Sequence, residues 1–312
     1  MIVVTGGAGF IGSNLITKLN SENFNDIVVV DSFENKNKLA NLKGKKLSTQ
    51  IDRDDFFDWL NQNNEMVEFI FHLGAKTDTT LTDNSVFDKY NLNYTKEIWK
   101  ACCKYQIPLI YASSAATYGD GSLGYSDDHR TIHKLKPLNL YGWSKHNFDL
   151  WALGQEEKPF FWAGLKFFNA YGPNEGHKGK MASMIHQAFK QIRKTGELQL
   201  FKSYNKNYEH GEQKRDFIHV NDIVDTIYWL MHHRKNSGIY NLGTGKARSF
   251  NAMALEVFSA LKKEPNIKYI EIPDSIRDKY QYFTQAEMGK IKSIMGKEKG
   301  YEFEVNQRDF MP

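Results

Sequence analysis

Apolar and polar positions along the first two-thirds of the chain follow two alternating patterns. Short apolar runs rich in β-branched or aromatic residues predict buried strands, and longer segments with apolar residues at helical spacing predict helices. The predicted strands are residues 2–5, 26–31, 69–72, 108–112 and 161–168, and the predicted helices are 10–19, 56–61, 85–105 and 141–152. Strands that alternate with helices in this way form βαβ units, so we expect a parallel sheet with right-handed crossovers.

This regular alternation fades after Phe168. The later segments are a loop at 172–179, a helix at 181–194, a polar, turn-rich stretch at 201–213, an amphipathic helix at 220–232, a strand at 238–242, and shorter elements at 250–261 and 267–272. The predicted fold is therefore α/β: a Rossmann-type doubly wound parallel sheet with a smaller mixed α/β substrate-binding lobe. We expect residues 1–168 and about 214–243 to form the dinucleotide-binding domain, and residues 169–213 and 244–312 to form the lobe.

Composition narrows the classes of function. The 312 residues carry a net charge of +4, and the lysines and arginines are scattered, which favours small phosphorylated ligands over nucleic acid. No apolar run approaches the length of a membrane span, and no charged segment precedes an apolar one at the start, so we expect neither membrane insertion nor a signal peptide. Cys102 and Cys103 are adjacent and ill-suited to a disulfide, which favours a cytoplasmic protein.

A glycine-rich turn follows the first predicted strand. Gly7, Gly9 and Gly12 have the spacing of a dinucleotide-binding turn, and Asp31 ends the second predicted strand 19 positions after Gly12. We expect Gly7 to permit the tight turn, Gly9 to let the backbone approach a pyrophosphate, and Gly12 to let helix and strand pack closely. The N–H groups at the helix N-terminus then face the phosphate charge.

Cofactor choice depends on the charges beside this turn. Asp31 is suited to accept from the adenosine ribose of NAD, and it would repel the 2′-phosphate of NADP unless cations offset its charge. Ser32, Lys38 and Arg53 are available to do so. The residues themselves therefore leave NAD and NADP both open.

A tyrosine and a lysine provide candidate chemistry. Tyr141 and Lys145 are four residues apart and lie on one face of a predicted helix. We expect the ammonium to lower the pKa of the phenol, so that Tyr141 can take a proton from a substrate hydroxyl, and Lys145 to bind the nicotinamide ribose. Ser114 follows a predicted strand, where its hydroxyl can hold the reacting oxygen. No metal site is predicted.

Together these motifs resemble the extended short-chain dehydrogenase/reductase family, in its branch of NAD-dependent sugar-nucleotide epimerases. The resemblance covers nearly the whole chain. It rests on residues 5–12 (TGGAGFIG), 112–119 (ASSAATYG), 137–145 (PLNLYGWSK), 168–173 (FNAYGP), 175–183 (EGHKGKMAS), 214–217 (KRDF), 241–245 (NLGTG) and 280–286 (YQYFTQA). The narrowest of these is the run EGHKG, which is similar to epimerases that act at C6 of an ADP-heptose.

The resemblance implies an isomerase that uses tightly held NADP, with NAD possible. Its substrate would be ADP-D-glycero-D-manno-heptose, converted through a 6-ketone to the L-glycero epimer for lipopolysaccharide synthesis, in a homo-oligomer that is a pentamer in the family. Lys178 would be the second acid/base beside Tyr141, although a glycine-flanked lysine could instead bind the diphosphate.

The resemblance also assigns binding residues. Besides those named above, the cofactor would be bound by Gly6, Phe10, Ile11, Leu73, Gly74, Ala75, Lys76, Thr77, Asn91 and Ala170, together with Tyr141, Lys145 and Lys178. The substrate would be bound by Ser114, Asn169, Lys180, Ser183, His186, Gln187, Phe201, Lys202, Ser203, Tyr204, Arg215 and Tyr280.

Three alternatives stay open at this point. A C4 epimerase of UDP-hexoses shares most of these motifs, and only the run EGHKG argues against it. A 4,6-dehydratase normally has an Asp-Glu pair where this chain has Ala115 and Ala116, which counts strongly against dehydration. A non-catalytic dinucleotide-binding protein would share the fold, but it has no need to keep Ser114, Tyr141 and Lys145 together.

Overall fold

The computed structural model describes residues 1–79, 81–277 and 280–296, and the end of the predicted lobe, residues 297–312, lies outside these ranges. The chain folds into two compact units. The first unit comprises residues 1–114, 139–166 and 220–240, and the second comprises residues 115–138, 167–219 and 241–312.

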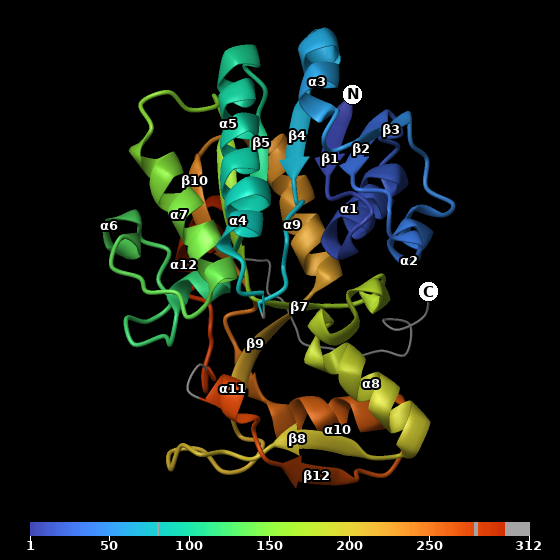
Figure 1. The fold of residues 1–312 in the computed structure, drawn as a ribbon, viewed down its shortest axis with the longest axis vertical. Coiled ribbons are helices and arrows are strands. Elements are labelled where there is room, and N and C mark those ends of the chain that lie inside the picture. The colour runs from blue at the N-terminus through green and yellow to red at the C-terminus, as the bar shows by residue number, and fades with distance from the viewer. Residues whose placement is uncertain (80, 278–279, 297–312) are drawn as a thin grey trace. The chain divides into compact units, whose positions relative to one another are not determined.

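A seven-stranded sheet forms the centre of the first unit (Figure 1). Its order is β10 (Gly238–Leu242), β6 (Trp162–Phe167), β5 (Leu109–Ser114), β4 (Phe69–His72), β1 (Ile2–Thr5), β2 (Ile27–Asp31) and β3 (Thr49–Asp52). The pairs β1–β2, β1–β4, β2–β3 and β4–β5 are parallel. All residues of β1, β2, β4 and β6 are buried, as their continuous apolar runs predict for a sheet covered on both faces. The predicted Rossmann-type parallel sheet is confirmed.

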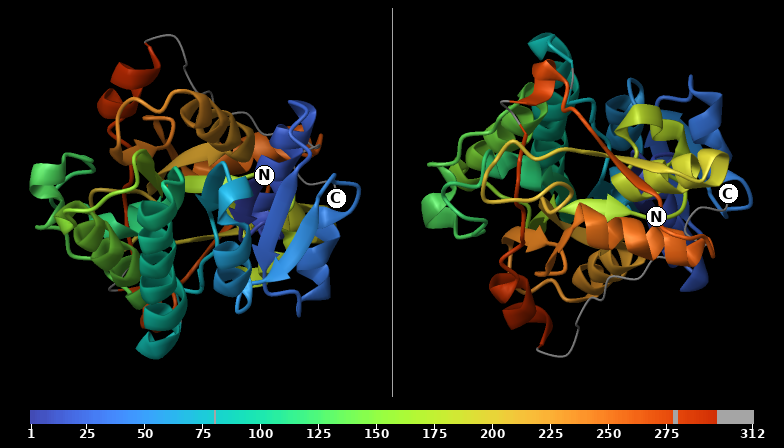
Figure 2. Two further views of the ribbon diagram at one scale, coloured as in Figure 1. Left: turned by 90° about the horizontal axis from the view of Figure 1, so that it is seen from above. Right: turned by 90° about the horizontal axis from the view of Figure 1, so that it is seen from below.

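Helices flank this sheet. They are α1 (Phe10–Ser21), α2 (Lys36–Leu39), α3 (Phe56–Asn63), α4 (Asn84–Phe87), α5 (Tyr94–Tyr105), α7 (Leu140–Gly154) and α9 (Val220–His232), with short 3-10 turns at Ala40–Leu42 and Asn64–Met66. Helix α1 packs against α9, and α7 packs against α4 and the segment that follows it (Figures 1 and 2). The single helix predicted at 85–105 is interrupted, because Asp88–Asn93 adopt a π-helix between α4 and α5.

The second unit combines two small sheets with helices. One sheet has the order β11 (Ala247–Ser249), β9 (Lys214–His219) and β7 (Asn169–Tyr171), and the other pairs β12 (Ile267–Ile270) with β8 (Leu198–Phe201) in parallel. The helices are α6 (His129–Ile132), α8 (Met184–Thr195), α10 (Phe250–Ala260), α11 (Asp274–Arg277) and α12 (Gly289–Met295), with 3-10 turns at Ala115–Tyr118 and Gly176–Met181. Helices α8 and α10 pack side by side over an apolar core that includes Ile185, Phe189, Met253 and Val257 (Figure 2).

The observed units differ most from the predicted boundaries in two places. Residues 115–138 belong to the second unit, because the Tyr118 hydroxyl donates to the side-chain oxygen of Asn241 and the Asn241 N–H donates to Asp127. Strand β9 also belongs there, because it pairs with β7 and β11. These interactions join segments more than a hundred residues apart at Asn241, which a pattern of local hydrophobicity does not reveal.

Among the described residues, no helix is long and apolar enough to cross a membrane. Over the same ranges, no group of three or more His, Cys, Asp or Glu side chains is arranged to hold a metal ion.

Candidate functional site

The glycine-rich turn joins β1 to α1 with very little space around its backbone. Gly6 has a left-handed φ of +68°, and a Cβ at this position would lie 2.5 Å from the backbone nitrogen of Gly74. A Cβ at Gly12 would lie 2.3 Å from the carbonyl oxygen of Gly6. The glycine that permits the tight turn is therefore Gly6, rather than Gly7 as the motif alone predicts, and Gly12 allows the close helix packing that was expected of it.

Asp31, at the end of β2, is buried and holds this turn from the side. One carboxylate oxygen accepts from the N–H of Ala8 at 3.0 Å, and the other accepts from the N–H of Ser32 at 2.8 Å and forms an ion pair with Lys38. A carboxylate offers about four acceptor positions, so one position remains for a ribose hydroxyl. Lys38 provides the cation that the sequence required beside Asp31.

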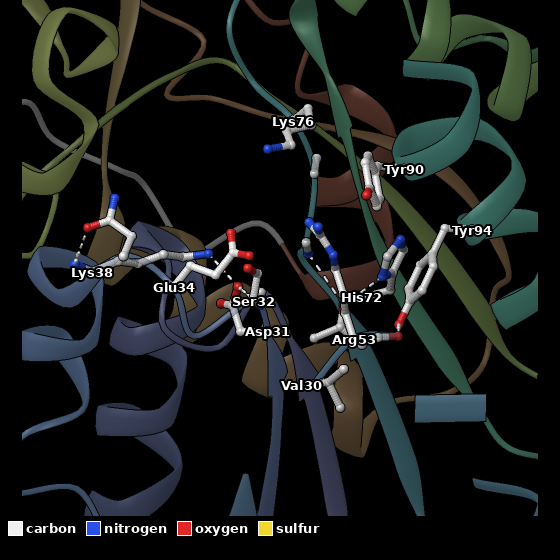
Figure 3. A pocket seen from close by; sticks show the side chains of 15 residues that line it. Val30, Asp31, Ser32, Glu34, Lys38, Arg53, His72, Lys76, Tyr90 and Tyr94 are labelled. Atoms are coloured by element: carbon white, nitrogen blue, oxygen red, sulfur yellow. Dashed lines mark hydrogen bonds and ion pairs between the residues drawn. The ribbon is translucent and has the colours of Figure 1, made fainter. Parts of the chain in front are cut away.

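A pocket of about 250 Å³ lies next to Asp31 within the first unit (Figure 3). It brings together eight of the predicted cofactor residues: Gly6, Asp31, Ser32, Lys38, Arg53, Gly74, Ala75 and Lys76. The Arg53 guanidinium stacks on the Tyr90 ring, 4.0 Å from its centroid, and the Tyr94 hydroxyl donates to the carbonyl of Arg53 at 2.9 Å. The pocket thus combines three cations with two aromatic rings, a chemistry suited to a phosphorylated nucleoside.

Several residues of this pocket were not predicted. Glu34, His72, Tyr90 and Tyr94 line it together with the expected residues (Figure 3). Tyr90 lies in the π-helical segment and directly precedes the predicted Asn91. That neighbour was its signal in the sequence.

The glycine turn and the pocket fit a dinucleotide. The close approach of backbone at Gly6 and Gly12 leaves room only for hydrogen at those Cα atoms, and a Cβ at Gly74 would be tightly packed, 3.2 Å from the backbone nitrogen of Gly6. Helix α1 has no acidic residue in its first turn and no side-chain cap at Gly9, so its N–H groups are available to a pyrophosphate.

Helix α7 and strand β5 position the catalytic pair. Asn139 caps α7 by accepting from the N–H of Gly142 at 2.8 Å, which places Tyr141 in the first turn and Lys145 one turn later. The Lys145 ammonium is buried and donates to the carbonyl of Ala112 at 2.7 Å. The hydroxyls of Tyr141 and Ser114 are hydrogen-bonded, and the carbonyl that Lys145 contacts belongs to the strand that ends at Ser114.

The pKa values of this pair are governed by burial. Burial raises the pKa of Tyr141, and the hydrogen bond with Ser114 opposes that rise. Burial lowers the pKa of Lys145 to about 8, against the opposing charge of Asp149. The prediction that Lys145 lowers the pKa of Tyr141 is therefore wrong for the protein alone, because the lysine bonds to a backbone carbonyl and desolvation dominates at the phenol.

A buried ion pair between Asp149 and Lys166 includes a residue of the same helix α7, and it was not predicted from the sequence. Asp149, one turn after Lys145 on α7, accepts from Lys166 at 2.6 Å, from the Ser113 hydroxyl at 2.7 Å and from the Tyr111 hydroxyl at 2.9 Å. Both charged side chains are fully buried. A lysine inside the apolar strand β6 was the signal for this pair, since a buried ammonium needs a partner.

The predicted second acid/base, Lys178, lies in the second unit on the 3-10 turn Gly176–Met181. Burial lowers the pKa of Lys178, and the charge of Glu175 opposes the effect. Glu175 is itself buried and accepts from the N–H of Ser183 at 2.6 Å and from its hydroxyl at 2.7 Å. Glu175 thus fixes the turn that carries Lys178, and the prediction did not include it.

Apart from Ser114, the predicted substrate residues fall into two groups within the second unit. The first surrounds the start of α8: Ser183 caps the helix at the N–H of His186, Gln187 donates to the carbonyls of Lys180 and Ala182, and the ring of His186 is buried. Burial lowers the pKa of His186 to about 4. These side chains hold local structure, so the structure gives no separate support for a substrate contact at His186.

The other group surrounds Arg215. Its guanidinium is buried between the rings of Phe250 and Tyr280, at 5.6 and 5.5 Å from their centroids, and Tyr280 meets Phe201 edge to face. In the segment after Phe201, Lys202 pairs with Glu271 at 2.6 Å and the Ser203 hydroxyl donates to the carbonyl of Asn205. Tyr204 is exposed beneath Arg277, and Asn169 accepts from Thr284 on another segment.

Comparison with known proteins places the chain in a family. Residues 2–243 match the NAD dependent epimerase/dehydratase family, and the chain belongs to that family. Its cofactor is accordingly a nicotinamide dinucleotide.

Curated relatives and solved structures narrow the resemblance. The chain is 43% identical to the ADP-L-glycero-D-manno-heptose-6-epimerase of Fusobacterium nucleatum, covering 100% of this chain and 97% of the relative. It is 46% identical to the enzyme of that name from Nitratidesulfovibrio vulgaris, over 94% of this chain and 91% of the relative. The crystal structure of the Helicobacter pylori ADP-L-glycero-D-manno-heptose-6-epimerase superposes with a TM-score of 0.77 at 28% identity, covering 99% and 93% of the two chains. MoeE5 in complex with UDP-glucose and NAD gives a TM-score of 0.75 at 25% identity, over 98% and 94%.

Proposed function

We propose that the chain is an isomerase that inverts C6 of the heptose in ADP-D-glycero-D-manno-heptose and forms the L-glycero epimer. The observation that carries this proposal is the identity of 43 and 46% to two curated ADP-L-glycero-D-manno-heptose-6-epimerases over at least 91% of each chain. The grouping of Ser114, Tyr141 and Lys145 supports it, because these residues supply the acid/base chemistry that such a reaction needs.

The first half of the reaction is assigned to α7 and β5. The bound dinucleotide supplies a hydride acceptor that later returns the hydride. Tyr141 takes the proton from the C6 hydroxyl as that carbon is oxidised to a ketone, and Ser114, already bonded to Tyr141, holds the same oxygen. Lys145 carries a positive charge below about pH 8. In the proposed complex this charge favours the phenolate of Tyr141 that accepts the proton, and it opposes the burial that raises the pKa of Tyr141 in the protein alone.

Inversion requires a proton donor for the opposite face of the ketone. We assign this role to Lys178, and its support is a lowered pKa together with a fixed place on a turn held by Glu175. A lysine whose pKa is lowered by burial exchanges protons near neutral pH more readily than an ordinary lysine does. Tyr141 belongs to the first unit and Lys178 to the second, so separate variants test the two roles.

The preferred dinucleotide is proposed to be NADP. Lys38 neutralises Asp31, and Arg53 borders the same pocket, so two cations are available to a 2′-phosphate. The variant Lys38→Ala should weaken NADP binding at least tenfold and leave NAD binding within about twofold, since it removes a cation while Asp31 keeps its acceptor position for a ribose hydroxyl. Equal loss of both dinucleotides, measured by fluorescence titration, would contradict this choice.

The deciding experiment follows ADP-D-glycero-D-manno-heptose by NMR in the presence of the purified protein. We expect the C6 signals of the L-glycero epimer to appear, and Tyr141→Phe and Lys178→Met each to abolish net epimerisation. The matched controls Tyr105→Phe and Lys190→Met change a half-buried tyrosine and an exposed lysine elsewhere and should retain activity. Turnover of a UDP-hexose at C4, with none of the heptose, would favour the C4 epimerase instead. A wild-type rate for Lys178→Met would contradict the role of Lys178.

A homo-oligomeric assembly, a cytoplasmic location and a place in lipopolysaccharide precursor synthesis stay predictions. Sedimentation of the purified protein tests the first of them directly.

A further inference from the structure

A continuous series of buried polar groups runs through the first unit from the end of β1 to the start of α7. Its members are Thr5, His72, Asn91, Thr95 and Ser144, and each is at most 4% exposed. Buried polar groups are costly unless they are hydrogen-bonded, so the partners of each one can be followed in turn.

The direction of each hydrogen bond in this series follows from the single proton of Thr95. That hydroxyl donates to the carbonyl of Asn91 at 2.6 Å, so it can only accept from the Nε2–H of His72, at 2.9 Å. Burial and the nearby charge of Lys145 lower the pKa of His72 to about 3, so the ring is neutral and its Nδ1 is an acceptor. The Thr5 hydroxyl then donates to Nδ1 at 2.6 Å, and Thr5 in turn accepts from the N–H of Gly74 at 3.4 Å.

Asn91 is the junction of the series. Its side-chain oxygen accepts from the N–H of Lys76 at 2.8 Å, and its amide donates to the carbonyl of Lys76 and to the hydroxyl of Ser144, both at 2.9 Å. The Ser144 hydroxyl donates a hydrogen bond to the carbonyl of Tyr141 at 2.7 Å. Asn91 lies in the π-helical segment, a local distortion that is common at functional sites.

These bonds tie two parts of the site to each other. Residues 74–76 are held at Gly74 through Thr5 and at Lys76 through Asn91, and they line the dinucleotide pocket. The other end of the series is the backbone of Tyr141. Loop and catalytic helix therefore share a path of directed hydrogen bonds in which every proton is assigned.

We propose that His72, Thr95 and Ser144 are positioning residues that fix the dinucleotide loop relative to the first turn of α7. The proposal rests on the proposed function for its kinetic consequences, while its binding consequences need only a nicotinamide dinucleotide. None of the three is assigned a contact with substrate or reacting atoms, and each acts through Gly74, Lys76 or Tyr141.

Thr95→Val is the sharpest perturbation, because valine has nearly the shape of threonine but cannot accept from His72. Thr226→Val is the matched control, since Thr226 is also buried in a helix of the first unit and donates to the carbonyl four residues earlier, at 2.8 Å. Thr95→Ser keeps the hydroxyl and serves as the rescue. The measurements are NADP affinity by fluorescence titration, kcat and KM for ADP-D-glycero-D-manno-heptose, and the thermal midpoint.

We expect Thr95→Val to weaken NADP binding and to lower kcat, each roughly tenfold, with KM for the heptose unchanged. Thr95→Ser should restore both values, and Thr226→Val should change only the thermal midpoint. Wild-type NADP affinity and kcat in Thr95→Val, or equal losses in Thr95→Val and Thr95→Ser, would overturn the proposal.

Ser144→Ala keeps the test decisive if Thr95→Val does not fold. It breaks the last step of the series and should lower kcat several-fold, whereas an unchanged kcat would overturn the proposal. If the wild-type protein turned over no heptose, the proposed function would fail, and the NADP affinities would still test the positioning role.

Discussion

The buried pair of Asp149 and Lys166 leads to the most specific prediction for stability. Neither side chain is exposed to solvent, and their charged atoms are 2.6 Å apart. Removing one partner of such a pair leaves an uncompensated charge in the interior and typically costs about 3–5 kcal/mol, whereas replacing both is often nearly neutral. The double variant Asp149→Asn/Lys166→Met should therefore be more stable than either single variant.

The hydrogen bonds of Asp149 determine which of the two single variants loses more stability. In Lys166→Met the carboxylate of Asp149 still accepts from the hydroxyls of Tyr111 and Ser113. The free energy of unfolding should therefore fall by about 3 kcal/mol, near the lower limit of that range. Asp149→Asn loses the ion pair and weakens both hydroxyl bonds, so its cost should approach about 5 kcal/mol. The double variant keeps a carbonyl oxygen for the hydroxyls and should lose about 1–2 kcal/mol.

Urea unfolding of dinucleotide-free protein, followed by tryptophan fluorescence, measures these differences. Lys100→Met is the control, because Lys100 and Glu97 form an exposed pair, and it should change the free energy of unfolding by less than about 1 kcal/mol. If the losses of the two single variants simply added in the double variant, the pair would not be coupled and the reasoning would be refuted.

Three further predictions follow from the same structure. The pKa of Lys145 is about 8, and the charge of Asp149 raises it, so kcat should fall above about pH 8. In Asp149→Asn/Lys166→Met this fall should begin at lower pH. A pH–rate profile whose alkaline limb does not move would contradict this prediction. Gly12→Ala should abolish dinucleotide binding, because the new Cβ would lie 2.3 Å from the carbonyl of Gly6. The control Gly154→Ala has open space around its Cα, so it should bind the dinucleotide normally and gain up to about 1 kcal/mol of stability. If Gly12→Ala retained the dinucleotide, the close packing at Gly12 would be contradicted. Asp216→Ala should destabilise the protein by more than about 3 kcal/mol, because Asp216 accepts from the N–H groups of Thr244, Gly245 and Ala286 and from the Thr244 hydroxyl. A thermal midpoint within about 2 °C of wild type, roughly the shift for about 1 kcal/mol, would exclude that role.

Much of the first unit could be predicted because its strands are continuous apolar runs. The predicted strand at 69–72 matches β4, and the one at 26–31 matches β2 to within one residue. Strand β3 was missed because it is a partly exposed edge strand with the sequence TQID. Strand β9 was missed because its polar residues are buried through partners distant in sequence, as Asp216 is with residues 244–286.

The candidate site, like the fold, combines features that the sequence predicts with features that it does not. The spacing of Tyr141 and Lys145 on one helix is a local property, and the sequence was sufficient to predict it. The contacts of Asp149 with Lys166, and of Arg53 with Tyr90, join separate segments of the chain. A lysine in an apolar strand indicates that a partner is needed, but no local pattern identifies which residue that partner is. The burial that governs the pKa of Tyr141 is likewise a property of the folded protein alone.

The path of the chain between the two units has a consequence for how such an enzyme can diverge. The chain passes from one unit to the other five times, after residues 114, 138, 166, 219 and 240. A single recombination event with a relative therefore cannot exchange one unit and keep the other. The segments of the dinucleotide pocket and the segment that carries Arg215 alternate along the chain, so a single crossover exchanges parts of both units together.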